Sequence, residues 1–272
     1  MSDSVATHRA IPRVTPRSAG VFEDLRSIAL RALRLTWRDP ETFLPALVIP
    51  VFFFVVNVGA LQSFVEDSFP PGFDYKAFQL PVAVVFAVTG VSRATSLVMD
   101  IQNGYFDRLL LTPVNRVTLL LGLMTADVVL IIALATPVAI LGVIIGIRSA
   151  TGVLGIFAFI VMAGLWGLAF TGFPYSIALR TGNPTAVNNA FLLFFPFAFL
   201  TTAYLPQSSM TGWLATATKF NPTTYLLEGM RAVLQEGWVW AAIGRAMLAI
   251  LGVGMVSFGL AFAALRGRVK RN

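Results

Sequence analysis

The stretch Asp100–Gly122 reads DIQNGYFDRLLLTPVNRVTLLLG and lies between two long apolar runs. Apolar runs of about 20 residues are long enough to cross the hydrocarbon core of a bilayer as helices. The charged and polar residues between the runs are therefore expected at or beyond a membrane surface. A helix at such a surface is accessible to a soluble partner, so this stretch is the first candidate for a functional contact.

The composition indicates a membrane protein with several spans. Of the 272 residues, 57% are hydrophobic and 12% are charged, whereas soluble domains carry about 25% charged residues. The formal net charge is +7, but the basic residues gather at the two ends of the chain, which favours a topology signal over nucleic-acid binding. The chain has no cysteine and a single histidine, His8, which excludes disulfides, thiolate metal sites and a histidine relay inside the membrane.

Six apolar stretches are long enough to span a bilayer, so we expect an all-α integral membrane protein. The expected spans are about Phe43–Phe64, Phe78–Met99, Val117–Ile147, Gly152–Leu179, Ala186–Leu205 and Trp240–Leu265. Pro137 and Pro174 lie inside the third and fourth spans, where proline commonly kinks a helix. Gly164, Gly167 and Gly172 are expected to serve close helix packing.

The distribution of charge orients the spans. Seven arginines precede residue 42, and four basic residues lie near the C-terminus. The loop Val65–Lys76 carries Glu66, Asp67 and Asp74 against one lysine. Because segments rich in Lys and Arg stay on the cytoplasmic side, we expect both termini in the cytoplasm.

The N-terminal part divides into a tail and an amphipathic helix. Residues 1–20 contain Ser, Thr and Pro and are expected to form a disordered cytoplasmic tail. Residues 21–40 place apolar and basic side chains on opposite faces of a helix, which fits a helix lying in the headgroup layer. A helix packed on a soluble partner is the alternative. The residues expected at this interface are Arg31, Arg34, Trp37 and Arg38.

The segment 206–238 is too polar to span a membrane and too apolar for an open loop. It mixes aromatic residues with Thr, Ser, Gln and Gly, and we expect a re-entrant or interfacial helical hairpin on the external side. Glu228 and Arg231 are three residues apart, so they can pair on one helix face.

No stretch of the chain fits the phosphate-binding loop of ATPases, in which a lysine follows a glycine. The three lysines are Lys76, Lys219 and Lys270, and none follows a glycine. ATP is therefore not expected to bind by that route. If ATP drives this protein, a second chain must carry the ATPase.

Asp127 lies in the third apolar stretch, where an ionisable residue is costly and usually has a role. Two interpretations stay open for it: a structural hydrogen bond at a neighbouring helix or the membrane boundary, and a place on a substrate pathway. Asp100 and Asp107 are seven residues apart, but a solvated polar face explains them better than catalysis. No catalytic or metal-binding residue is predicted.

Three motifs of the chain resemble the permease subunits of ABC-2 type exporters. The first comprises Asp100, Gly104, Leu109, Leu110, Thr112, Pro113, Arg116 and Gly122. The second comprises Tyr204, Leu205, Pro206, Trp213, Asn221, Pro222, Tyr225, Glu228, Gly229, Met230 and Arg231. The third is Trp37-Arg38-Asp39-Pro40, before the first span. Two positions depart from the family pattern, since Asp100 stands where Glu is usual and Tyr105 where Thr or Ser is frequent.

The resemblance, closest to the daunorubicin-resistance type, implies a six-span transmembrane domain over residues 41–272. It further implies a dimer with a second permease chain, two copies of an ABC ATPase, and a multi-pass location in a bacterial inner or plasma membrane. ATP and Mg would bind to the ATPase, and no cofactor to this chain. Residues 100–116, approximately, would form a coupling helix docked in a cleft of the ATPase. Leu109 and Leu110 would either insert into that cleft or pack on the bundle of membrane helices. Asp107, Arg108 and Arg116 would lie at the rim of the ATPase cleft and orient the helix there.

The implied function is outward transport of an amphipathic or hydrophobic substrate such as a drug, an antibiotic or a lipid-like molecule. Export of a lipid-linked glycan or cell-envelope lipid, an ion-coupled carrier without an ATPase, and a non-transporting scaffold remain alternatives. The candidate path residues are Asp127, Phe191, Phe194 and Phe195. Lipid-facing packing explains the phenylalanine run equally well.

Overall fold

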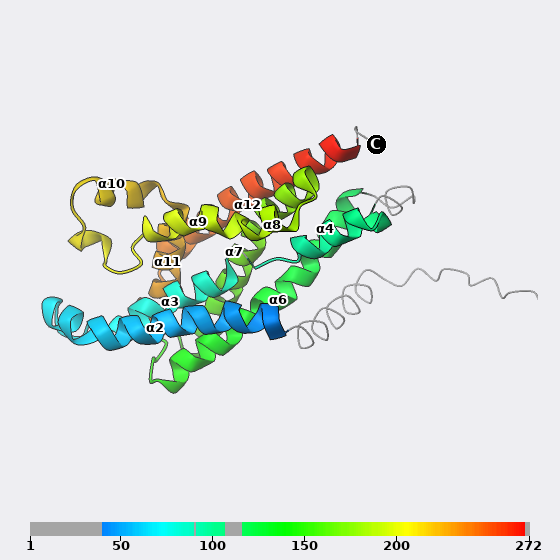
Figure 1. The fold of residues 1–272 in the computed structure, drawn as a ribbon. Helices are drawn as coiled ribbons and strands as arrows, with labels where there is room; N and C mark the ends of the chain where they lie inside the picture. Colours follow the sequence, from blue (N-terminus) through cyan, green and yellow to red (C-terminus); the bar gives the residue numbers. More distant parts are fainter. Residues whose placement is uncertain (1–39, 90, 107–115, 270–272) are drawn as a thin grey trace, which may run out of the picture.

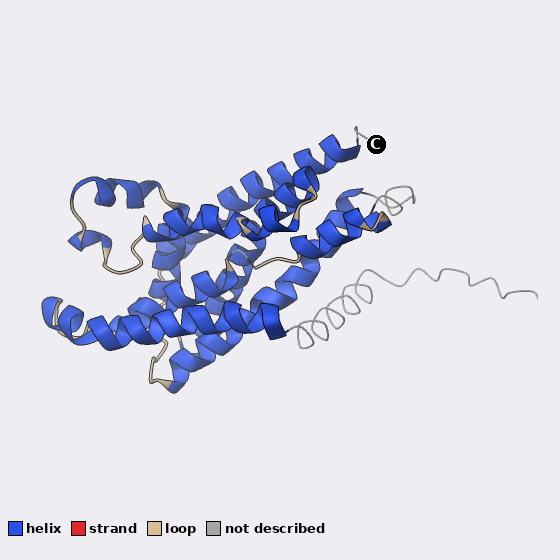
Figure 2. Ribbon diagram, viewed as in Figure 1, coloured by secondary structure: helices blue, strands red, loops and turns tan. Residues whose placement is uncertain are grey.

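The computed structural model describes residues 40–89, 91–106 and 116–269. Every regular element in these ranges is helical, and no strand occurs in them (Figure 2). The helices are α2 (Pro40–Ser68), α3 (Tyr75–Val88), α4 (Ala94–Gln102), α6 (Arg116–Ile144), α7 (Gly152–Thr181), α8 (Pro184–Asn188), α9 (Ala190–Phe199), α10 (Gly212–Phe220), α11 (Pro222–Arg231) and α12 (Trp240–Val269). A 3-10 turn, η1 (Gln207–Ser209), precedes α10, and a π turn, η2 (Ala232–Glu236), follows α11.

Four helices in the described ranges are long and apolar enough to cross a membrane, namely α2, α6, α7 and α12. They correspond to the first, third, fourth and sixth expected spans, with ends that differ from the expected ones by a few residues. Sequence periodicity is weak in these helices because lipid and neighbouring helices both accept apolar side chains. Their length and hydropathy are therefore the features that reveal them.

The second and fifth expected spans are interrupted. The second consists of α3 and α4, separated by residues 89–93, and the fifth consists of α8 and α9, after which residues 200–205 are not helical. Pro196 lies inside α9, near the point where it ends. The total of six spans stays a prediction, because the interrupted segments fall below the length of a continuous span.

The long helices α2, α6 and α12 extend along the length of the molecule (Figure 1). The start of α2, α4 and the end of α12 lie toward one end of the molecule, and α10 lies toward the opposite end. The two ends of the described chain thus share a side, which agrees with an even number of crossings. Which side faces the cytoplasm stays a prediction.

Buried side chains form two large groups along the length of the molecule. The first core joins α3, α6, α7, α9, α11 and α12 and contains Trp166. The second core joins α4, α8 and the adjoining parts of α6, α7 and α12, with Leu97, Phe106 and Val187 among its members. The division between the two cores coincides with the interruption between α3 and α4.

The α7–α12 pair is packed with almost no space at Gly172. A Cβ built on Gly172 would lie 2.5 Å from the backbone carbonyl carbon of Ser257. The Ser257 hydroxyl donates a hydrogen bond to the Ala169 carbonyl, across the same contact. A small residue and an interhelical hydrogen bond thus bring the two spans together, as membrane helices commonly do.

Candidate functional site

A cavity of about 260 Å³ lies between α2, α3 and α9. One face of α2 contributes residues at helical spacing, including Ile49, Phe53 and Asn57. A second wall comes from α3 and includes Gln79 and Phe86. These residues recur three, four or seven positions apart, so each helix presents a single stripe to the cavity.

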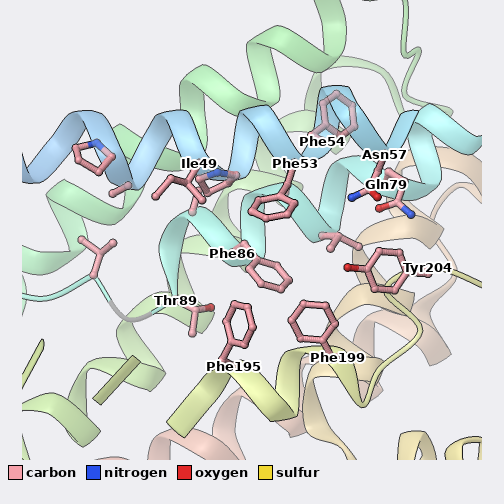
Figure 3. Close-up of a pocket in the computed structure, with 17 residues that line it drawn as sticks. Ile49, Phe53, Phe54, Asn57, Gln79, Phe86, Thr89, Phe195, Phe199 and Tyr204 are labelled. Atoms are coloured by element: carbon pink, nitrogen blue, oxygen red, sulfur yellow. The ribbon is translucent and has the colours of Figure 1, made fainter. Parts of the chain in front are cut away.

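The third wall comes from α9 and the segment after it. Phe195 and Phe199 are one helical turn apart and line the cavity, and Tyr204 completes it. Phe86 faces both phenylalanines edge-on, with ring centroids 6.5 Å from Phe195 and 6.2 Å from Phe199. Aromatic side chains thus surround the middle of the cavity (Figure 3).

The polar residues of the cavity are not spread evenly. Asn57, Gln79 and Tyr204 gather at one end, and Thr89 lies at the other, beyond Phe86 (Figure 3). The walls between them are apolar. Such a cavity suits a molecule that is mainly hydrophobic and carries one or two polar groups.

The predicted path residues do not all come together at this cavity. Phe195 lines it, whereas Phe194 is buried in the first core against Phe86 and Phe170. The side chain of Phe191 lies outside the described part. Asp127 does not line the cavity and belongs to a different contact.

Asp127 is fully buried and lies beside the interruption between α3 and α4. Its Oδ1 accepts a hydrogen bond of 2.9 Å from the backbone N–H of Arg93, the residue before α4. The N–H groups at the start of a helix have no partner in the helix itself, so the carboxylate satisfies one of them. The carboxylate also interacts with the buried hydroxyl of Tyr175 in α7.

The end of α3 is fixed on the other side of the same interruption. Trp166 Nε1 in α7 donates a 2.9 Å hydrogen bond to Thr89 Oγ1, and that hydroxyl donates to the Val85 carbonyl at 2.6 Å. A buried Trp usually finds such a partner. The break between α3 and α4 is therefore fixed by side chains of two spans, α6 and α7.

Arg231, one of the predicted hairpin residues, contacts two other segments of the chain through its guanidinium. Its guanidinium donates to the Phe78 carbonyl at 3.0 Å, to Thr202 Oγ1 at 2.9 Å and to the Thr202 carbonyl at 2.7 Å. Burial lowers the pKa of Arg231 to about 9, and the nearby Glu228 opposes this change. The side chain therefore remains charged at neutral pH.

Asn221 explains the Asn-Pro pair of the second motif. Its Oδ1 accepts from the Thr223 N–H at 2.9 Å and begins α11, while Pro222 occupies the first helical position. Its Nδ2 donates to the Phe197 and Leu200 carbonyls at 2.6 and 2.8 Å. One side chain thus begins one helix and satisfies carbonyls at the end of another.

The remaining hairpin residues take separate places. The Tyr225 hydroxyl donates to the Lys219 carbonyl at 2.5 Å. Trp213 is exposed on α10, and Pro206 lies directly before η1. Burial raises the pKa of Glu228, and Arg245 and Arg231 act in the opposite direction. The expected pairing of Glu228 with Arg231 is thus a long-range attraction, since the guanidinium is engaged by Phe78 and Thr202.

Only part of the predicted coupling segment is described. Asp100 lies in the last turn of α4, and Gly104 follows it with φ 69°, a conformation that glycine adopts without strain. Phe106 is buried in the second core, and Arg116 begins α6. The following predicted residues lie outside the described part: Asp107, Arg108, Leu109, Leu110, Thr112, Pro113, Arg31, Arg34, Trp37 and Arg38.

The family model described as ABC-2 type transporter matches residues 23–234. The chain belongs to this family. As a member of the ABC-2 type transporters it is a membrane permease with several apolar helices. Among the described residues of this permease, no cluster of His, Asp or Glu fits a metal ion.

Two relatives of this ABC-2 permease are named for drug resistance. It is 25% identical to the daunorubicin resistance ABC transporter permease protein DrrB1 of Streptomyces coeruleorubidus, over 89% of this chain and 84% of that protein. It is also 25% identical to the probable doxorubicin resistance ABC transporter permease protein DrrC of Mycobacterium tuberculosis, over 74% of this chain and 72% of that one. The resemblance inferred from the sequence motifs is thus confirmed.

Sequence reasoning missed most of the cavity of this ABC-2 permease. Asn57 and Gln79 are amides within apolar stretches, a signal that was available because amides in lipid require partners. Phe53 and Phe86 carried no such signal, since phenylalanine is common on lipid-facing surfaces. Phe199 belongs to the same phenylalanine run as Phe195, but only the structure shows that these two members face the cavity.

Proposed function

We propose that this chain is the membrane-spanning subunit of an ATP-driven exporter, and that the cavity between α2, α3 and α9 binds its amphipathic or hydrophobic substrate. The observation that carries this proposal is the cavity itself. It has aromatic walls at Phe86, Phe195 and Phe199, and its two amides gather with the Tyr204 hydroxyl at one end. Drugs with a planar aromatic body and a polar substituent match that distribution.

The energy comes from a partner ABC ATPase, present in two copies and carrying ATP and Mg. The family assignment supports this partner, and so does the lack of a phosphate-binding loop in the sequence. The coupling segment at about residues 100–116 is the docking site, with α4 as its continuation into the membrane domain. The interfacial helix at residues 21–40 contributes a second contact.

A second permease chain of the same sequence completes the transporter. The large apolar side chains on α2 support this part of the proposal, because many are more than half exposed, for example Phe52 at 61% and Val55 at 57%. In the most apolar part of α2, 11% of the residues are buried, whereas 44% are buried in the corresponding parts of α6 and α7. Lipid covers the part of this surface that the second chain leaves. The protein resides in a bacterial inner or plasma membrane with both termini in the cytoplasm.

The test uses inside-out membrane vesicles that contain the full-length chain and its ATPase. Doxorubicin fluorescence reports uptake into the vesicles after ATP and Mg are added. We expect uptake that depends on ATP, and a reduction of several-fold in the Phe195→Ala and Phe199→Ala variants, since each loses an aromatic wall of the cavity.

Phe197→Ala is the matched control, because Phe197 lies on the same helix, is 59% exposed and does not line the cavity. It should transport at the wild-type rate. Uptake driven by a proton or sodium gradient in the absence of the ATPase would instead support an ion-coupled carrier. Equal transport by all three alanine variants and wild type would remove the cavity from the proposal.

A further inference from the structure

The short helix α4 connects the predicted coupling segment to the membrane domain, and both of its ends are held. At its start, the backbone N–H of Arg93 donates to Asp127 of α6. At its end, Gln102 Nε2 donates a 3.0 Å hydrogen bond to the Gly182 carbonyl, just after α7. Because α3 ends separately at Thr89, α4 is a helix of its own and not a continuation of α3.

Side chains also join α4 to α8. Thr95 Oγ1 donates a 3.2 Å hydrogen bond to Asn188 Oδ1, the last residue of α8. Near this contact, Leu97 of α4 and Val187 of α8 are both buried in the second core. The two short helices therefore share an apolar contact and a polar one, and they lie side by side in Figure 1.

The next helix after α8 is a wall of the cavity. Asn189 alone separates α8 from α9, so the two helices are directly connected. Phe195 and Phe199 extend from α9 into the cavity. A continuous path of contacts thus runs from the end of α4, through Thr95 and Asn188, to the aromatic side chains that line the candidate substrate site.

We propose that α4 and α8 move as one unit, and that the Thr95–Asn188 contact positions α9 so that a displacement of α4 changes the cavity at Phe195 and Phe199. This inference rests on the proposed function, because it assigns a route by which the partner ATPase reaches that same cavity. Thr95 and Asn188 are positioning residues, because neither of them lines the cavity. A packed pair of helices can transmit such a shift because it has few alternative arrangements.

The first experiment removes the polar contact. Thr95→Val keeps the shape of the side chain and loses its donor, and Asn188→Ala loses the acceptor. In the complex with its ATPase, each variant should hydrolyse ATP at the wild-type rate and move about two- to tenfold less doxorubicin per ATP, the factor expected from one hydrogen bond. Thr136→Val is the control, since the Thr136 hydroxyl donates only to Ile132 within α6.

The second experiment restores the contact covalently. The chain has no cysteine, so a Thr95→Cys and Asn188→Cys pair can be joined specifically by a short bis-methanethiosulfonate reagent. The unlinked pair should transport poorly, and the linked pair should recover transport per ATP, because a link between two parts of one moving unit does not hinder it.

The outcomes separate the two proposals. A linked pair that loses transport shows that α4 and α8 move relative to each other, and this overturns the inference while leaving the exporter function intact. Wild-type transport per ATP in Thr95→Val and Asn188→Ala also overturns it. A wild-type complex that moves no doxorubicin on ATP hydrolysis contradicts the proposed function, and the inference with it.

Discussion

The Arg231 guanidinium lies 3.5 Å from the centroid of the Phe78 ring and donates a hydrogen bond to the Phe78 carbonyl. One buried cation thus contacts both the ring and the backbone of the same residue in α3. Its other donors reach Thr202, in the non-helical segment after α9. Arg231 therefore joins α11 to two walls of the cavity, α3 and the segment after α9.

Replacement of Arg231 should destabilise the membrane domain. Arg231→Met leaves buried carbonyls of Phe78 and Thr202 without donors, at a cost on the order of 3 kcal/mol. Arg231→Lys should rescue little, because an ammonium cannot supply the planar fork that reaches both residues. Thermal unfolding in detergent measures the change, with Arg180→Met, at an exposed position, as the control. An unchanged midpoint for Arg231→Met would contradict the role of this contact.

Asn221 should tolerate aspartate poorly, although aspartate begins helices well. Asn221→Asp keeps the acceptor for the Thr223 N–H but loses the donor to the Phe197 and Leu200 carbonyls and brings a negative oxygen toward them. We expect a loss of about 1–3 kcal/mol in the free energy of unfolding.

The matched control for Asn221 is Asn183, which also precedes a proline and begins a helix. Its Oδ1 accepts from the Thr185 N–H at 2.9 Å at an exposed site. Asn183→Asp should therefore be nearly neutral in the same thermal assay. If the two aspartate variants unfold alike, the donor function of Asn221 is not what stabilises the hairpin.

Folding and transport should depend on the acceptor oxygen of Asp127 and not on its negative charge. Asp127→Asn retains an oxygen for the Arg93 N–H, whereas Asp127→Leu leaves that buried donor unpaired, at a cost of about 1–3 kcal/mol. We expect the first variant to fold and transport like wild type, and the second to unfold at lower temperature. A stable Asp127→Asn protein without transport would favour the substrate-path interpretation of this residue.

The sequence predicted those parts of the molecule that depend on local chemistry. The four long helices follow from apolar length alone, and Asn221-Pro222 marks a helix start by its own side chain. The non-helical segment at residues 200–205 could not be predicted, because its carbonyls are satisfied by Asn221 and Arg231, which lie more than fifteen residues further along the chain. The cavity was missed for the same reason, since its walls come from three separate helices.

Gly172 should be intolerant of even one added methyl group, whereas a nearby glycine of the partner span should accept it. In Gly172→Ala the new Cβ would lie 2.5 and 2.6 Å from the backbone carbonyl carbon and oxygen of Ser257, and backbone cannot rotate away as a side chain can. Gly252→Ala meets nothing within 4 Å and replaces glycine by a better helix former.

Among the described helices, α7 and α12 share the most extensive contact. Their separation at Gly172 should also break the Ser257–Ala169 hydrogen bond, which crosses the same contact. We expect Gly172→Ala to lower the thermal midpoint in detergent by several degrees and to reduce the yield of folded protein, while Gly252→Ala leaves both unchanged or raises the midpoint. If the double variant Gly172→Ala/Ser257→Ala lost no more stability than Gly172→Ala alone, the steric contact and the hydrogen bond would be one coupled interaction. Equal stability of Gly172→Ala and Gly252→Ala would show that the two spans are not in contact at this level of the membrane.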